Sequence, residues 1–84
     1  MTPAEALADI RGLASANRIV FTRHARERMA LRGAHARDVR EALANAHTCV
    51  ASDDKWKATG PDLDGDDLTC IVALDSDVVV VTIF

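Results

Sequence analysis

The residues best suited to chemistry lie in one basic segment over residues 21–33, which reads Phe-Thr-Arg-His-Ala-Arg-Glu-Arg-Met-Ala-Leu-Arg-Gly. On a helix, His24, Arg28 and Arg32 stand at i, i+4 and i+8, so they project from one side in successive turns. An imidazole can accept a proton, and guanidinium groups bind phosphate oxygens bidentately. This face would therefore combine a base with a phosphate clamp. The alternative is a solvated helix face whose arginines pair with neighbouring carboxylates.

Charge is distributed unevenly along the chain. Residues 1–50 carry eight arginines against five acidic residues, whereas residues 51–84 carry two lysines against eight aspartates. The net charge of −3 therefore conceals a basic first half and an acidic second half. A local basic patch is compatible with RNA binding, but the acidic balance argues against avid non-specific binding to nucleic acid. The acidic half would suit a basic protein surface.

Two other clusters contain side chains that can bind metal ions. His47 lies two residues before Cys49, but no further ligand stands at a suitable spacing. Asp62, Asp64 and Asp66 alternate as calcium ligands do, yet no glutamate follows at the last ligand position of an EF-hand. A solvated acidic loop explains the aspartates better. We expect no metal and no cofactor.

The start of the chain and its two cysteines bear on the compartment. Residues 1–5 lack the basic and then apolar pattern of a signal peptide, and no apolar run approaches the ~20 residues of a membrane span. We therefore expect a cytoplasmic protein without membrane contact. Cys49 and Cys70 lie in apolar, strand-like segments, so we expect two reduced thiols that lie apart.

The pattern of apolar residues predicts one α+β domain over residues 1–84, with helices on one face of a mainly antiparallel sheet. Thr2, Pro3 and Glu5 form a capping-box pattern that starts the first helix. Helices are expected over residues 3–16, from the arginine-rich segment to Gly33, and over 38–46. Strands are expected over 18–22, 55–59, 68–74 and 78–84, with a further possible strand over 48–51. We write the order as α-β-α-α-β-β-β.

Two strands carry more specific expectations. The valines of residues 78–81 indicate a central strand covered on both faces, paired with residues 68–74 through the turn Asp75–Asp77. Lys57 and Trp56 must point to opposite faces of their strand. We expect Trp56 in the core. Lys57 either completes the arginine patch on an open sheet face or is simply solvated.

Three segments of the chain together resemble a known family. The basic segment contains Phe-Thr-x-His-Ala-x-x-Arg-Met-x-x-Arg-Gly, followed by Asp-Val-x-x-Ala-Leu over residues 38–43 and a closing Val-Val-Val-Val-Thr-Ile-Phe. This pattern resembles a bacterial domain of unknown function with a His-Ala-x-x-Arg-Met core. That family is usually grouped with the RelE/ParE-like and BrnT-like toxins of type II toxin–antitoxin systems. The resemblance covers about residues 19–84.

The resemblance implies a RelE/BrnT-like fold and an endoribonuclease that cleaves mRNA, free or on the ribosome, without a metal. It also implies a cognate antitoxin protein as partner. By position, His24 and Arg28 match the motif, Arg32 is its trailing basic residue and Thr82 matches the threonine of the last strand.

Cleavage by a 2′-hydroxyl needs a base and cations around the phosphorane. We therefore expect His24, Arg28 and Lys57 to be catalytic and to converge on one exposed anion site. We expect Arg23, Arg32 and Thr82 to bind the RNA. The alternative is a non-catalytic interaction module, an immunity or antitoxin-like partner that uses its acidic half.

Overall fold

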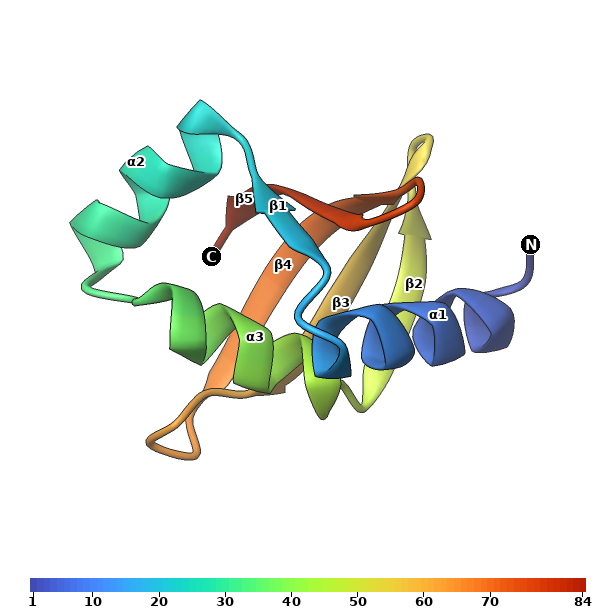
Figure 1. Ribbon diagram of the computed structural model, residues 1–84, viewed down its shortest axis with the longest axis horizontal. Coiled ribbons are helices and arrows are strands. Elements are labelled where there is room, and N and C mark those ends of the chain that lie inside the picture. The colour runs from blue at the N-terminus through green and yellow to red at the C-terminus, as the bar shows by residue number, and fades with distance from the viewer.

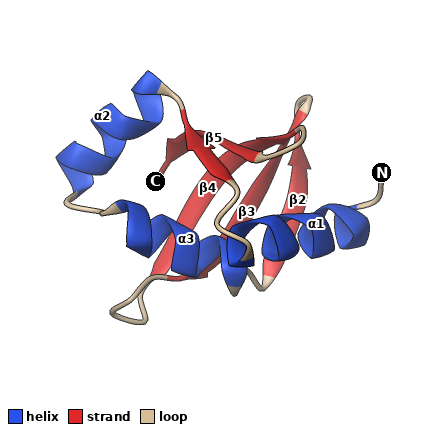
Figure 2. Ribbon diagram, in the orientation of Figure 1, coloured by secondary structure: helices blue, strands red, loops and turns tan.

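A computed structural model describes all residues, 1–84. The expected α+β class is confirmed: the chain forms three helices and five strands, and the last four strands follow one another without an intervening helix (Figures 1 and 2). The elements are α1 (Pro3–Ser15), β1 (Ile19–Phe21), α2 (Arg23–Arg32), α3 (Ala36–Ala44), β2 (Thr48–Ser52), β3 (Lys55–Pro61), β4 (Asp67–Leu74) and β5 (Val78–Ile83). The possible strand over 48–51 is therefore formed, and four strands follow α3.

The strands form one sheet in the order β1-β5-β4-β3-β2. β5 pairs with β4 in antiparallel fashion and with the short β1 in parallel. The expectation of an interior last strand, joined to β4 by a tight turn, is confirmed. The parallel pairing arises because α2 and α3 carry the chain away after β1, and the last strand returns beside it (Figure 1). An ion pair of 2.9 Å between Arg18 and Asp77 ties the start of β1 to that turn.

The core lies between the helices and one face of the sheet. Alternate residues of the strands face it, among them Cys70, Val72 and Val80, and all three helices contribute buried side chains. The opposite face is open, since Val20 and Val50 are 47% and 54% exposed. Val78 and Val80 of β5 are buried and Val79 and Val81 are half-buried, so the strand is fully covered on one face and only partly on the other, where cover on both was expected. A strand with neighbours on both edges needs only one covered face, because adjacent side chains shield the other in part.

Thr22, between β1 and α2, fixes where α2 begins. Its backbone N–H donates to the Val80 carbonyl over 3.0 Å, which extends the pairing with β5 by one residue. Its hydroxyl donates to the Val81 carbonyl over 3.0 Å and accepts from the Ala25 N–H over 3.1 Å. The same oxygen thus caps the helix and holds it against the sheet. α2 consequently lies beside the end of β5, where β1 no longer pairs.

β3 and α3 approach each other at Gly60. A Cβ atom on this residue would stand 2.0 Å from the Ala42 carbonyl oxygen and 2.9 Å from the Ala46 Cα. Only a residue without a side chain permits this contact, so the glycine sets the distance between helix and sheet. Trp56, on the same strand and face, packs against the core as expected.

α3 begins at Ala36, two residues before the expected start at Asp38. The Asp38 carboxylate accepts from the His35 N–H over 3.0 Å and from the Leu63 N–H over 3.3 Å. These backbone hydrogen bonds, the one from His35 first, hold the pKa of Asp38 below its ordinary value. The spacing of apolar residues predicts a start at Asp38. In the structure the Asp38 carboxylate caps the His35 N–H, so Asp38 lies within the first turn of a helix that begins at Ala36. The bond to Leu63 also ties the acidic loop to α3.

Cys49 and Cys70 are free thiols, as expected. Both pair with Ala58 on its two sides, so one strand separates them. Two strand spacings amount to roughly 10 Å, beyond the reach of a disulfide. Burial raises the pKa of Cys70 to about 12, so this thiol stays protonated in the folded protein.

Candidate functional site

α2 presents the basic segment on the surface. The Thr22 cap starts the helix, and Gly33, at a φ of 74°, ends it in the left-handed conformation that glycine adopts freely. Ala25 and Met29 are the two buried residues of the helix. All of its arginines and its histidine are exposed. The helix therefore buries Ala25 and Met29 and presents its charged side chains to solvent.

A hollow lies beside the C-terminal half of α2. It is lined by Arg28, Leu31, Arg32 and Phe84 and has a volume of about 370 Å³. Leu31 is 81% exposed and Phe84 is 51% exposed, which is unusual for side chains of this size. Arg32 is held at the margin, since its Nη2 donates to the Asp67 carbonyl over 3.3 Å. We call these four residues the Phe84 hollow. It combines guanidinium groups with an accessible aromatic ring.

Lys57 reaches the same ring from the sheet. It is exposed on the open face of β3, and its Nζ lies 5.9 Å from the centroid of the Phe84 ring, within the range of a cation–π contact. In the register of the sheet, Lys57 pairs with Ile71, and Ile71 pairs with Thr82. Thr82 therefore shares a row of the open face with Lys57. Phe84 stands between the lysine on the sheet and the arginines on α2.

The cations around Phe84 are not neutralised by carboxylates. The salt bridges of the chain are Arg18–Asp77, Arg23–Glu27, His47–Asp67 and Lys55–Asp54. Arg28, Arg32 and Lys57 belong to none of them. Arg28 in the hollow and Lys57 beside its ring thus lack a protein counter-ion and favour an anion there, while Arg32 also borders the acidic loop. Pairing with neighbouring carboxylates, the alternative for this helix, describes only Arg23 in the basic segment.

The other expected site residues take different positions. His24 is exposed, makes no hydrogen bond within the protein and stands one helical turn before Arg28. Its place in a shared site with Lys57 stays a prediction. Arg23 donates to Glu27 over 3.3 Å and does not line the hollow. The structure therefore gathers Arg28, Arg32 and Lys57 around one ring, with Thr82 in the row of Lys57.

Phe84 and Leu31 did not enter the sequence-based site. Phe84 reaches the hollow because a register shift in the pairing of β4 with β5 changes which residues face outward near the chain end. The signal that could have found it is the presence of a terminal aromatic residue in a chain with only three.

His47 and Asp62, which belong to the two clusters with possible metal ligands, have other partners in the structure. His47 Nε2 lies 3.3 Å from Asp67 Oδ1. Asp62 Oδ1 accepts from the N–H groups of Asp64 and Asp66, each over 2.9 Å, so this carboxylate organises its own loop. No group of three or more His, Cys, Asp or Glu side chains is arranged to hold a metal ion.

Comparison with known proteins places the chain in a family. Residues 21–84 match the family described as Domain of unknown function (DUF4258). The chain belongs to this family. The matched region starts at the first residue of the basic segment and contains every residue of the Phe84 hollow, whereas α1 lies before it. No curated protein matches the sequence. None of the three helices is long and apolar enough to cross a lipid bilayer.

Proposed function

We propose that the protein binds single-stranded RNA at the Phe84 hollow and cleaves it there without a metal ion, as a RelE/BrnT-like toxin of a type II toxin–antitoxin system. The observation that carries this proposal is the approach of Arg28, Arg32 and Lys57 to one exposed aromatic ring with no carboxylate among them. Cations that follow the phosphates and an aromatic ring on which a base stacks are the usual elements of single-strand binding.

The chemistry follows from these positions. The base stacks on Phe84, and the scissile phosphate lies between Arg28, Arg32 and Lys57. His24, one turn along the same helix, accepts the proton of the 2′-hydroxyl, whose oxygen then attacks the phosphorus. The bond from phosphorus to the 5′-oxygen breaks, and this oxygen takes a proton from the solvent. The products are a 2′,3′-cyclic phosphate and a 5′-hydroxyl. The cations stabilise the charge that develops on the phosphorane oxygens.

A cognate antitoxin is the expected protein partner of such a toxin. An antitoxin that covers the Phe84 hollow would need to place carboxylates near Arg28, Arg32 and Lys57. The proposal therefore predicts that RNA and the antitoxin exclude each other.

The non-catalytic alternative also has an observation in its favour. The acidic loop between β3 and β4 is ordered by the bonds to Asp62, while Leu63 is 52% exposed at its surface. Such a loop could bind a basic protein surface. In that case RNA would bind weakly and would not be cleaved.

Cleavage of a defined single-stranded RNA in the presence of EDTA tests the proposal. We expect Arg28→Ala to lower kcat about 10²–10³-fold, the effect of losing one preorganised donor to the transition state. RNA affinity should fall less than rate, because a group aimed at the transition state binds the ground state more weakly. His24→Ala should abolish both cleavage and growth arrest on induction.

Arg11→Ala is the matched control, because it removes one exposed arginine from α1, away from the hollow. It should cleave like the parent protein. A substrate with a single 2′-deoxy position at the cut site should be bound and left intact. Unchanged cleavage and toxicity in both His24→Ala and Arg28→Ala would show that the catalytic proposal is wrong.

A further inference from the structure

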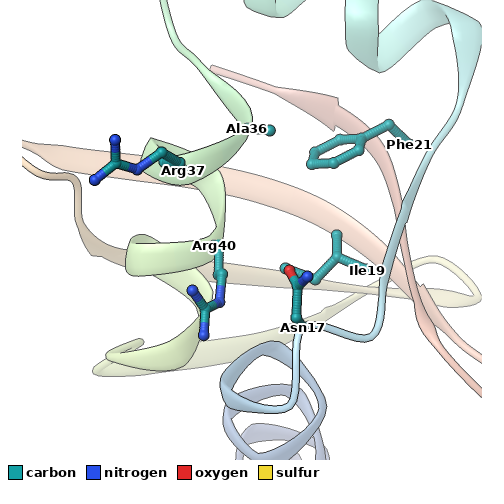
Figure 3. Close-up of a pocket in the computed structure, with 6 residues that line it drawn as sticks. All are labelled: Asn17, Ile19, Phe21, Ala36, Arg37 and Arg40. Carbon is teal, nitrogen blue, oxygen red and sulfur yellow. The ribbon is translucent and has the colours of Figure 1, made fainter.

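A second cavity lies at the N-terminal end of the basic segment, where Phe21 lines it. It has a volume of about 280 Å³ and is enclosed by the end of α1, by β1 and by α3. Figure 3 shows Asn17, Ile19 and Phe21 on one side and Ala36, Arg37 and Arg40 on the other. It shares no lining residue with the Phe84 hollow. The proposed ribonuclease chemistry leaves this cavity unused.

The floor of the cavity is apolar and contains an aromatic ring. Phe21 points from β1 towards Ala36 of α3, and Ile19 lies beside it (Figure 3). The Arg26 guanidinium lies over the Phe21 ring, with its Cζ 5.9 Å from the centroid. Phe21 lines the cavity and Arg26 does not, so the ring offers the cavity an aromatic surface, which suits a planar group.

Polar groups at the mouth of the cavity have unused hydrogen-bonding capacity. Asn17 adopts a left-handed backbone conformation, with a φ of 59°, and its side-chain amide makes no hydrogen bond in the protein. The amide can donate and accept at once. Arg37 is exposed and belongs to no ion pair; its guanidinium lies at the outer margin, directed away from Phe21 (Figure 3).

Arg40 differs from Arg37 in that it is fixed. Its Nε donates to the Ala14 carbonyl and its Nη2 to the Ser15 carbonyl, each over 3.3 Å. It thereby satisfies carbonyl groups at the C-terminal end of α1 and holds α1 against α3. Arg40 therefore keeps the wall of the cavity in place, while the exposed Arg37 remains available to an anion.

We propose that this cavity binds one nucleotide unit, a base together with its phosphate. The base lies against Phe21 and Ile19, its polar edge meets the Asn17 amide, and the phosphate lies at the mouth beside the exposed Arg37. A volume just below the ~300–1,000 Å³ of sites for drug-sized ligands suits one base, with the sugar and phosphate outside. If the nucleotide belongs to an RNA chain, the inference rests on the proposed function; a free mononucleotide would bind independently of it.

A nucleotide fits these observations better than an acidic peptide segment does. Both ligands could pair with the Asn17 amide, a base through its edge and a peptide through its backbone. A planar base with its phosphate suits a cavity of about 280 Å³ that has an aromatic ring in its floor and a guanidinium at its mouth. A peptide side chain that is flat enough for this floor is aromatic and carries no anion, so the combination of ring and guanidinium favours the nucleotide.

Amide chemical shifts in two-dimensional NMR test the inference, with the four ribonucleoside monophosphates and an eight-nucleotide RNA as probes. We expect shifts at Asn17, Phe21 and Arg37 with at least one monophosphate. Asn17→Gly removes the amide and keeps the left-handed conformation, so the fold should be unchanged. Asn17→Gly and Arg37→Ala should each weaken monophosphate binding about tenfold, whereas Arg11→Ala should not.

The remaining outcomes distinguish a free mononucleotide from an RNA chain, and the cavity site from the proposed ribonuclease function. If monophosphates shift the cavity residues while His24→Ala and Arg28→Ala leave RNA cleavage unchanged, the cavity site holds and the proposed function fails. If only the RNA shifts these residues, the nucleotide is part of a chain. Shifts confined to the Phe84 hollow, or none with any probe, would overturn the inference. So would concentration-dependent self-association abolished by Arg37→Ala, which would assign the cavity to the acidic loop of a second copy.

Discussion

At the scale of residues, α2 divides its arginines between two aromatic side chains. Arg28 and Arg32 line the hollow with Phe84, while Arg26 lies over Phe21. Positions 26 and 28 stand about 200° apart around a helix, so they cannot serve the same surface. The spacing that predicts one basic face therefore describes only part of the segment. The remaining arginines depend on which neighbours the fold places beside them.

The hydroxyl of Thr22 allows a first prediction. It accepts from the Ala25 N–H and donates to the Val81 carbonyl, so Thr22→Ala removes a helix cap and a link to the sheet together. We expect a loss of about 1–2 kcal/mol in the free energy of unfolding, measured by urea denaturation. Thr22→Ser keeps the hydroxyl and should lose much less. Equal losses in the two variants would mean that the hydroxyl does not hold α2.

Cys70 gives a prediction on alkaline pH. Its pKa is about 12 in the folded protein against an ordinary value of 9.0, because burial penalises the thiolate. Above pH 9 the unfolded chain loses this proton and the folded chain keeps it, so the unfolded state is favoured. Stability should fall by about 1.4 kcal/mol per pH unit between pH 9 and 12 from this group. Cys70→Val should show a shallower fall over that range, and below pH 8 the slopes of the two proteins should coincide.

At the scale of elements, Gly60 and Gly12 form a matched pair. A Cβ at Gly60 would meet backbone atoms of α3 at 2.0 Å, whereas a Cβ at Gly12 has no neighbour within 4 Å. Gly60→Ala should therefore cost about 3 kcal/mol, because backbone cannot move aside as a side chain can. Gly12→Ala, in the exposed interior of α1, should raise stability by about 0.5–1 kcal/mol. Thermal unfolding followed by circular dichroism measures both, and a stable Gly60→Ala would contradict the close contact.

The elements that local chemistry determines could be predicted, and those that distant contacts determine could not. The Thr2–Glu5 capping box, the Gly33 stop and the interior position of β5 followed from capping groups and a β-branched run. The start of α3 and the parallel pairing of β1 with β5 did not. The parallel pairing depends on residues far along the chain. The start of α3 depends on a cap that the residue type at position 35 does not indicate.

The candidate site shows the same limit. Arg28 and Arg32 could be placed together because a helix fixes their separation. The approach of Lys57 was left open, since it depends on which sheet face is covered and on the contact with Phe84. Phe84 itself was missed, because its direction depends on the register shift between β4 and β5. Helical spacing thus predicts part of a site, and the sheet must supply the rest.

At the scale of the whole molecule, opposite charges occupy neighbouring surfaces. The Phe84 hollow borders the acidic loop at Arg32, which donates to the Asp67 carbonyl and lines a depression with Asp62, Asp64 and Asp66. The carboxylates repel a phosphate chain that strays towards the loop. Nucleic acid should therefore be confined to the side of α2 nearest Phe84 and Lys57, and non-specific binding should be weak.

This confinement leads to the last prediction, the salt dependence of RNA binding. Three neutralised phosphates should give a slope of about −2 in a plot of log K against log salt concentration, since a single strand contributes about 0.7 per contact. Lys57→Ala and Arg28→Ala should each reduce the slope by about 0.7, whereas Arg11→Ala should leave it unchanged. Fluorescence anisotropy with a labelled RNA at several salt concentrations measures the slope. A steep slope that Arg11→Ala reduces as much as Arg28→Ala does would mean that RNA contacts the basic half diffusely. The Phe84 hollow would then not be the binding site.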